Sequence, residues 1–436
     1  MSVFRPTPIA GKLQSLDGLR AIAIILVFFC HISDLVPTVN LPSYYLQWYL
    51  SQGWFGVDLF FVLSGFLITG ILIDTREAEN YFSGFYARRV LRIFPLYYAT
   101  LIGLLVLAQI LGRTHASGAA EISRQLPLPE DRWTYFCFLT NWIGLWKAQW
   151  DTHFQSILAH FWSLAVEEQF YFFWPFLVWI MRPRSIPWIA AGLAGLSAVI
   201  RLGWVAHIGV QMLIAPQSVA VQIATICRLD GLFIGALCAY LFREPKIMPR
   251  IYKWLPWIAT LGIGSCFAVF SAMLFFPRRA GMFLYGPTPA VDHSLGDAVR
   301  LFLECGGFTL LALGFGGVVL LAAYTETEDT WMQRLLQSRF LAPIGTYSYG
   351  IYVFHVPILG LARTYLLPRL TANTAAEFVL NNCAFILLAA VACFVIPALS
   401  YEFFEKKILR YKRYFGPRYA PATGNRSAEP ISISSA

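Results

Sequence analysis

Charged residues are scarce in this sequence. Asp, Glu, Lys and Arg together make up only 13% of its 436 residues, and 58% of the residues are hydrophobic. In soluble domains roughly a quarter of the residues are charged. An ordinary soluble globular protein is therefore excluded, because so apolar a chain cannot cover its surface with polar groups. The composition indicates an all-α, polytopic membrane protein.

Metal-binding spacings are also missing. The eight cysteines form no Cys-x-x-Cys or Cys/His pattern, so we predict neither a metal site nor a disulfide framework. Most cysteines lie inside apolar runs, where free cysteine behaves as a small hydrophobic residue. They are Cys30, Cys137, Cys227, Cys238, Cys266, Cys305, Cys383 and Cys393. Five histidines are predicted in or beside outer loops: His115, His153, His160, His207 and His293.

A cleavage signal is not visible at the N-terminus. Arg5 and Lys12 precede an apolar run, as in a signal peptide, but no small-x-small pattern follows His31. We predict a retained first helix that begins in the cytoplasm. Asp17 either caps this helix or acts directly at a site, and the sequence leaves both readings open.

Long apolar runs are what the sequence has in abundance. Ten of them can cross a bilayer. They cover approximately residues 15–33, 54–73, 93–112, 161–181, 187–206, 221–242, 255–276, 300–323, 345–367 and 379–404. A further run, 133–146, is too short and too rich in Trp, Asn and Thr to cross. We predict that it is re-entrant or interfacial.

The positive residues orient these ten spans. Loops predicted to face the cytoplasm are rich in Lys and Arg, whereas loops 37–53 and 207–220 contain neither. Both termini are therefore predicted in the cytoplasm, and the net charge of +9 is mainly an orientation signal rather than a sign of nucleic-acid binding. We predict a membrane domain over 1–414 and a disordered cytoplasmic tail over 415–436.

The first helix carries two polar residues that an apolar span does not need. Arg20 and His31 are eleven residues apart, which returns them to within about 20° of the same helix face, roughly 16 Å apart along the axis. A guanidinium is costly in lipid, so this face is expected to line protein or water. The spacing indicates a functional helix.

Other polar residues fall in one layer of the predicted membrane region. Adjacent carboxylates such as Glu167 and Glu168 repel each other unless cations match them or they are protonated, as an acid/base site requires. Arg228 and Asp230 pair either with each other or with these glutamates in a structural network. His355 and Ser64 either pack and hydrogen-bond or belong to the site. The supporting polar network is predicted to comprise Asp58, Ser64, Arg228, Asp230 and His355.

A second cluster is predicted on the cytoplasmic side. Arg89 and Arg92 are three residues apart, so they lie on one helix face. They serve either as a positive-inside anchor or as a fork that holds a polyanion such as phosphate. Arg20 begins from the same side of the membrane.

These motifs together resemble the acyltransferase-3 family of integral membrane acyltransferases over residues 14 to about 410. Arg20 and His31 match its arginine, ten intervening residues and histidine, and Arg89 and Arg92 match its Arg-x-x-Arg motif. The blocks GVDLFFVLSGFLIT, FWSLAVEEQFYFFWP, RLDGLFIGAL and YSYGIYVFH occur in the expected order. Glu405 stands in Glu-Lys-Lys where the family has Glu-Lys-Pro, so no role is transferred to it.

The resemblance implies a function. Family members transfer an acyl group, by default acetyl, from cytoplasmic acyl-coenzyme A to a hydroxyl of a cell-surface glycan or a small molecule. It assigns donor binding to Arg20, Arg89 and Arg92, and general-base catalysis to His31. Glu167 or Glu168 is expected to orient His31 or to bind sugar hydroxyls. The implied location is the bacterial inner membrane, with acyl-coenzyme A as a substrate and no bound cofactor.

Two other classes of function remain open. In a transporter or flippase the same buried charges would form a substrate path, although no inverted repeat and no paired broken helices are visible. A non-catalytic sensor would not need the Arg20–His31 face. The acceptor, whether lipopolysaccharide, exopolysaccharide, a lipid-linked precursor or a small molecule, is left open. An extracytoplasmic step is expected to need a partner protein, because residues after 414 are too few to fold as a further domain.

Overall fold

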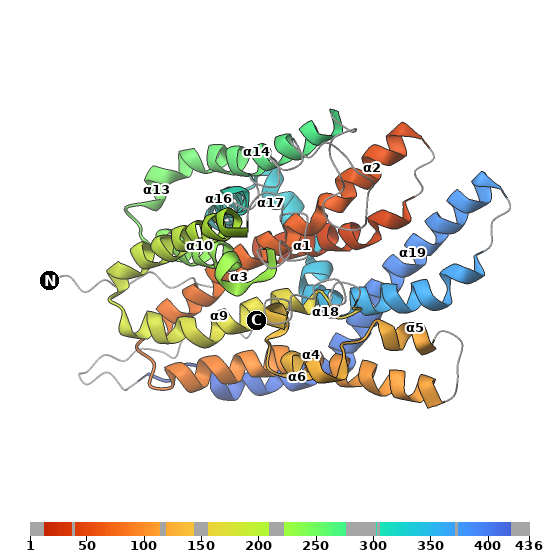
Figure 1. Cartoon of the computed structure of the whole chain (residues 1–436). Helices are drawn as coiled ribbons and strands as arrows, with labels where there is room; N and C mark the ends of the chain where they lie inside the picture. Colours follow the sequence, from red (N-terminus) through yellow and green to blue (C-terminus); the bar gives the residue numbers. More distant parts are fainter. Residues whose placement is uncertain are drawn as a thin grey trace.

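The computed structural model describes residues 13–36, 40–113, 119–143, 156–208, 222–275, 302, 306–370 and 374–419. Every structural statement below concerns these residues. They form helices and turns, and no strand occurs among them (Figure 1). The all-α class predicted from the sequence is therefore confirmed.

The described helices have the following bounds: α1 Gln14–Ile32, α2 Leu41–Ser51, α3 Phe55–Asp74, α4 Tyr81–Arg113, α5 Ala119–Arg124, α6 Arg132–Phe136, α9 Phe161–Ile180, α10 Ile186–Ile208, α12 Thr225–Arg243, α13 Met248–Ile251, α14 Leu255–Phe275, α16 Phe308–Tyr324, α17 Trp331–Leu336, α18 Leu341–Tyr365, α19 Ala375–Ser400 and α20 Lys406–Leu409. In Figure 1, α14 and α4 lie along opposite edges of the bundle, and α1, α3 and α9 run between them.

Eight helical segments of the described chain are long and apolar enough to cross a membrane. They are Gln14–Leu35, Pro42–Asp74, Tyr81–Arg113, Pro183–Trp204, Thr225–Arg243, Met248–Ser271, Leu341–Arg369 and Ala376–Phe415. Each contains or overlaps one predicted run. The chain is thus an integral membrane protein, while the count of ten spans and the cytoplasmic termini stay predictions.

The two remaining predicted runs correspond to α9 and α16. The α9 helix has 20 residues, but Glu167, Glu168 and Gln169 lower its hydropathy below that of a typical span. The α16 helix has 17 described residues and is apolar throughout. Within the predicted run 133–146, residues 133–136 belong to α6 and Thr140–Trp142 form one turn, both too short to cross a bilayer. Residues 144–146 lie outside the described residues, so the re-entrant or interfacial placement stays a prediction.

Glycines allow the central helices to approach closely. A Cβ atom on Gly235 of α12 would lie 2.1 Å from the Val62 carbonyl oxygen of α3. A Cβ atom on Gly345 of α18 would lie 2.1 Å from the Asp17 carbonyl oxygen of α1. Small residues of this kind bring helices together in membranes, where no hydrophobic effect drives them. The α1, α3, α12 and α18 helices are thereby packed around one centre.

The cysteines are free wherever the structure describes them. Cys30, Cys227, Cys238, Cys266 and Cys393 are buried, as expected of small core residues. Cys137 and Cys383 are exposed, which corrects the prediction for these two.

Candidate active site

A cavity of about 510 Å³ lies between α1, α3, α4, α9 and α18. Arg20, Arg89, Arg92 and Lys412 line it where α1 and α4 begin, and we name this part the cationic end. Ser163 at the start of α9 lines it too. Arg76, in the turn between α3 and α4, donates hydrogen bonds to the carbonyl oxygens of Trp179 and Met181 at the C-terminal end of α9. The C-terminal end of α9 therefore lies near the start of α4 and the cationic end, and the start of α9 lies far from them. The cavity therefore runs along the helices.

Two of the arginines predicted for donor binding have no carboxylate partner. Among the described residues, neither Arg89 nor Arg92 has a carboxylate oxygen within ion-pair distance. Arg20 Nη1 lies 2.5 Å from Asp17 Oδ1, so Asp17 pairs with Arg20. Asp17 is not the helix cap, because α1 begins after Leu13. The cationic end thus carries an excess of positive charge that suits an anionic ligand.

The predicted carboxylates face the same cavity. The Tyr171 hydroxyl donates a hydrogen bond of 2.7 Å to Glu167 Oε2 and accepts one from Ser64. Glu168 lines the cavity as well, and its Oε1 atom is buried without a hydrogen-bond partner in the described part of the chain. The contacts of the described residues do not join either glutamate to His31. The glutamates therefore belong to the cavity wall rather than to the surroundings of the histidine.

His31 is held by its own helix. Its Nδ1 atom lies 2.8 Å from the carbonyl oxygen of Val27. A carbonyl oxygen only accepts hydrogen bonds, so this contact assigns the proton to Nδ1. In the neutral ring Nε2 then carries a free electron pair. The geometry fits a general base that takes a proton at Nε2.

Two further histidines continue from His31 in a row of ring contacts. The His355 ring centroid is 4.9 Å from that of His31 and 5.0 Å from that of His160. His355 Nδ1 lies 2.7 Å from the Tyr352 carbonyl oxygen, and its Nε2 is buried without a partner in the described structure. We name His31, His160 and His355 the histidine cluster. The sequence grouped His355 with the site but assigned His160 to the outer loops, although it directly precedes α9 and is 4% exposed.

The histidine cluster adjoins the cavity through two hydroxyl groups. Ser163 and Tyr352 both line the cavity, and their hydroxyls share a hydrogen bond. The Tyr352 hydroxyl also donates to the His160 carbonyl oxygen at 3.1 Å, and its ring centroid is 5.5 Å from that of His355. The cationic end therefore lies at one end of the cavity, and the histidine cluster lies beside the other end, behind Ser163 and Tyr352, since none of the three histidines lines the cavity. Along α1, Arg20 and His31 are separated by roughly 16 Å.

The predicted pairing of Arg228 with Asp230 or with the glutamates is wrong. Arg228 Nη2 lies 2.6 Å from Asp58 Oδ1, and Asp230 Oδ2 lies 2.7 Å from Arg201 Nη2. Residues two apart on a helix point to different faces, so each meets a different neighbour. The Thr309 hydroxyl donates to Asp230 at 2.7 Å. These residues tie α3, α10, α12 and α16 together and do not line the cavity.

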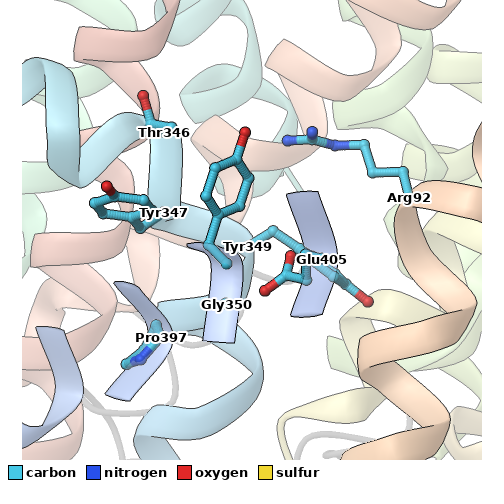
Figure 2. A pocket seen from close by; sticks show the side chains of 8 residues that line it. Arg92, Thr346, Tyr347, Tyr349, Gly350, Pro397 and Glu405 are labelled. Atoms are coloured by element: carbon cyan, nitrogen blue, oxygen red, sulfur yellow. The ribbon is translucent and has the colours of Figure 1, made fainter. Parts of the chain in front are cut away.

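Glu405 lies beside Arg92. A π-helical turn, Tyr401–Glu405, directly follows α19 and buries the Glu405 side chain. Glu405, Arg92 and Tyr349 line a small second cavity of about 10 Å³, room for about one water molecule. Figure 2 shows the Arg92 side chain extending toward the hydroxyl end of Tyr349. Glu405 thus lies next to the cationic end, across the small cavity that it shares with Arg92.

Several residues that the sequence singles out lie outside the described residues. They are Arg5, Lys12, His115, His153, His293 and Cys305, and the His207 side chain is not described either.

Comparison with known proteins gives the family. The profile of a family described as an acyltransferase domain matches residues 13–402. The peptidoglycan O-acetyltransferase OatA of Listeria monocytogenes is 29% identical over 407 residues, which are 90% of this chain and 55% of that protein. The putative peptidoglycan O-acetyltransferase YrhL of Bacillus subtilis is 27% identical over 409 residues, 91% of this chain and 55% of the relative. A putative O-acetyltransferase of Staphylococcus aureus (strain COL) is 26% identical over 368 residues, 81% of this chain and 52% of the relative.

The chain spans about half the length of these curated relatives. It matches no solved structure. The family profile nevertheless covers the cationic end apart from Lys412, and all of the histidine cluster. The chain belongs to the acyltransferase-3 family of integral membrane acyltransferases.

Proposed function

We propose that this chain is an O-acyltransferase that moves an acyl group, acetyl by the names of its relatives, from acyl-coenzyme A to a hydroxyl of a cell-wall carbohydrate. The observation that carries the proposal is one cavity that has Arg89 and Arg92, without a carboxylate partner among the described residues, at one end and a histidine base beside the other. Each end suits one part of the reaction.

The donor occupies the cationic end with its phosphates. Coenzyme A carries several phosphate charges on a nucleotide and its thioester on a long flexible arm. Arg89 and Arg92 have no carboxylate partner within the described chain, so phosphates supply their counter-charge through charge-assisted hydrogen bonds. The distance of roughly 16 Å from Arg20 to His31 is one that an extended arm can span.

His31 acts on the acceptor. Its Nε2 atom removes the proton from the acceptor hydroxyl as the hydroxyl oxygen attacks the thioester carbonyl carbon. The tetrahedral intermediate collapses, the carbon–sulfur bond breaks, and the thiolate leaves. The proton on His31 then passes to the thiolate, so that an ester and free coenzyme A are the products and the histidine is neutral again.

The acceptor approaches from the histidine side. Two of the relatives named above, OatA and YrhL, are peptidoglycan O-acetyltransferases by their names, which supports a cell-wall carbohydrate or its lipid-linked precursor as acceptor. A donor bound at the cationic end and an acceptor at the histidine cluster would meet from opposite sides of the bilayer. This arrangement supports a bacterial inner-membrane location with the cationic end toward the cytoplasm.

The proposal is tested by the release of coenzyme A. Purified protein in lipid is given acetyl-coenzyme A with and without cell-wall carbohydrate, and free coenzyme A is measured by mass spectrometry. We expect acceptor-dependent release that falls by about 10²- to 10⁴-fold in His31→Ala, because general-base catalysis contributes that much. Donor binding, measured directly, should be retained.

The matched control is Cys383→Ala, which changes an exposed residue away from the cavity. It should keep full activity. Release at the wild-type rate by His31→Ala would overturn the role of His31. No release by folded wild-type protein with any short acyl donor would overturn the acyltransferase proposal and favour a transporter or flippase that uses the buried charges as its path.

A further inference from the structure

The chain returns to the cationic end after its last long helix. Following α19, it passes through the π-helical turn and α20 into a short 3-10 helix, Arg410–Phe415, and residues 416–419 continue beside α4. Residues 415–419 are the first part of the predicted tail, and the structure places them. Residues 420–436 lie outside the described chain.

This returning segment is docked by several hydrogen bonds. Asn80 Nδ2 donates to the Gly416 carbonyl oxygen at 2.8 Å, and Asn80 Oδ1 accepts from the Arg418 backbone N–H at 2.8 Å. The Glu79 N–H donates to the Arg418 carbonyl oxygen at 2.8 Å. Arg88 Nη1 donates to the Phe415 carbonyl oxygen at 2.8 Å. The Asn80 side-chain amide thus binds the segment with both its donor and its acceptor, which fixes the residues of the segment that lie opposite Asn80.

Docking places Lys412 in the cavity. Lys412 is half-buried and lines the cavity together with Arg20, Arg89 and Arg92, whereas its neighbours Arg410 and Arg413 are exposed. It has no carboxylate within ion-pair distance among the described residues. A cation held next to unpaired arginines is repelled by them unless an anion binds between them.

We propose that Lys412 is a further donor-binding residue, which the docked C-terminal segment delivers to the cationic end to bind a phosphate of the acyl donor. The inference rests on the proposed function, since it names one more residue of the same donor site. Lysine fits the role because its ammonium is a compact charge with three donors on a flexible stem.

The test compares Lys412→Ala with Lys407→Ala. Both variants remove one lysine charge from the same segment, but Lys407 is exposed and does not line the cavity. The KM for acetyl-coenzyme A should rise about tenfold in Lys412→Ala, as expected for the loss of one charge-assisted hydrogen bond, and stay unchanged in Lys407→Ala. The kcat at saturating donor should stay unchanged in both variants.

A second readout isolates the phosphates. Adenosine 3′-phosphate 5′-diphosphate carries the phosphates of the donor without its acyl arm and should compete with acetyl-coenzyme A. Its inhibition constant should rise about tenfold in Lys412→Ala and stay at the wild-type value in Lys412→Arg, which keeps the charge. Lys412→Gln, which keeps a polar side chain without the charge, should behave as Lys412→Ala does.

The outcomes separate this inference from the proposed function. Wild-type turnover of acetyl-coenzyme A is established first, and its absence would overturn both. If the wild type turns over and the Lys412 variants match Lys407→Ala in KM and inhibition constant, the inference is wrong and the proposed function stands. A fall in kcat with an unchanged KM would also overturn it, because that result indicates a structural role.

Discussion

Arginines occur in two settings in this molecule, and the settings differ in pairing. Arg228 and Arg201 are buried beside Asp58 and Asp230, each within 2.7 Å of a carboxylate oxygen. At the cationic end Arg89 and Arg92 line a cavity and have no carboxylate partner among the described residues. The paired arginines hold helices together, whereas the unpaired ones are available to a ligand. Pairing therefore distinguishes Arg201 and Arg228 from Arg89 and Arg92, whereas Arg20 at the cationic end is paired with Asp17.

The largest expected effect breaks the paired setting. Asp58→Ala leaves Arg228 buried without its counter-ion, which costs roughly 3–5 kcal/mol of the free energy of unfolding. The thermal midpoint in detergent should fall strongly. Asp329→Ala is the control, because it removes an exposed carboxylate that pairs with Arg334 outside the candidate spans. If Asp58→Ala has the same thermal midpoint as the wild type, the buried ion pair of Asp58 and Arg228 does not stabilise the packing of α3 against α12.

A smaller effect, and one on binding instead of stability, is expected at the cationic end. Arg92→Ala removes a phosphate contact worth roughly 1.5–3 kcal/mol, so the KM for acetyl-coenzyme A should rise about 10- to 100-fold. The thermal midpoint should not fall, because no ion pair is broken. Arg250→Ala, an exposed residue of α13, should leave both values unchanged. If Arg92→Ala lowers the thermal midpoint and leaves the KM unchanged, Arg92 stabilises the fold as the paired arginines do and does not bind the donor.

The smallest effect is expected at the exposed pair of Arg334 and Asp329. The Arg334 side chain donates a hydrogen bond that lowers the pKa of the Asp329 carboxyl. Any stabilisation from this pair is present above the ordinary pKa of Asp and is lost as the pH falls through the lowered value. Because both groups are exposed, Arg334→Ala should leave the thermal midpoint at neutral pH unchanged within error. A measurable fall would mean that surface pairs contribute to stability in this protein.

The sequence predicted the positions of the helices better than it predicted which residues they pack against. Apolar runs and the positive residues between them identify most of the helices, since length and hydropathy are local properties. The α9 helix is not among the candidate spans, and it carries Glu167 and Glu168, which belong to the cavity wall. Whether α9 crosses the membrane depends on the residues packed around it, and these residues are distant from α9 in the sequence.

The partners of the buried charges were beyond the sequence. Arg228 and Asp58 are separated by 170 residues, and their contact follows from the packing of α12 on α3. Arg201 was missed because it lies in an apolar run with no motif around it. The predicted network grouped Asp58, Arg228 and Asp230 with the site, but these residues lie in the layer of ion pairs behind it.

The candidate site was predicted in its parts but not in its arrangement. The spacing of Arg20 and His31 placed both on one face of α1, and both ends of the cavity lie along that helix. His160 was missed because the residue before a span resembles a loop residue in sequence. Lys412 was missed because a basic residue after the last span fits the positive-inside rule equally well.

The hydrogen bond between Ser163 and Tyr352 joins two helices, α9 and α18, through residues that are 189 positions apart in the chain. These hydroxyls lie where the cavity meets the histidine cluster. The Tyr352 hydroxyl also donates to the His160 carbonyl oxygen, so the same two side chains hold the residue that precedes α9. A polar contact buried between helices is costly to leave unmade, so it resists a sliding of α9 along α18. The contact that borders the site thus also fixes the position of the helix that follows His160 relative to the helix that carries His355.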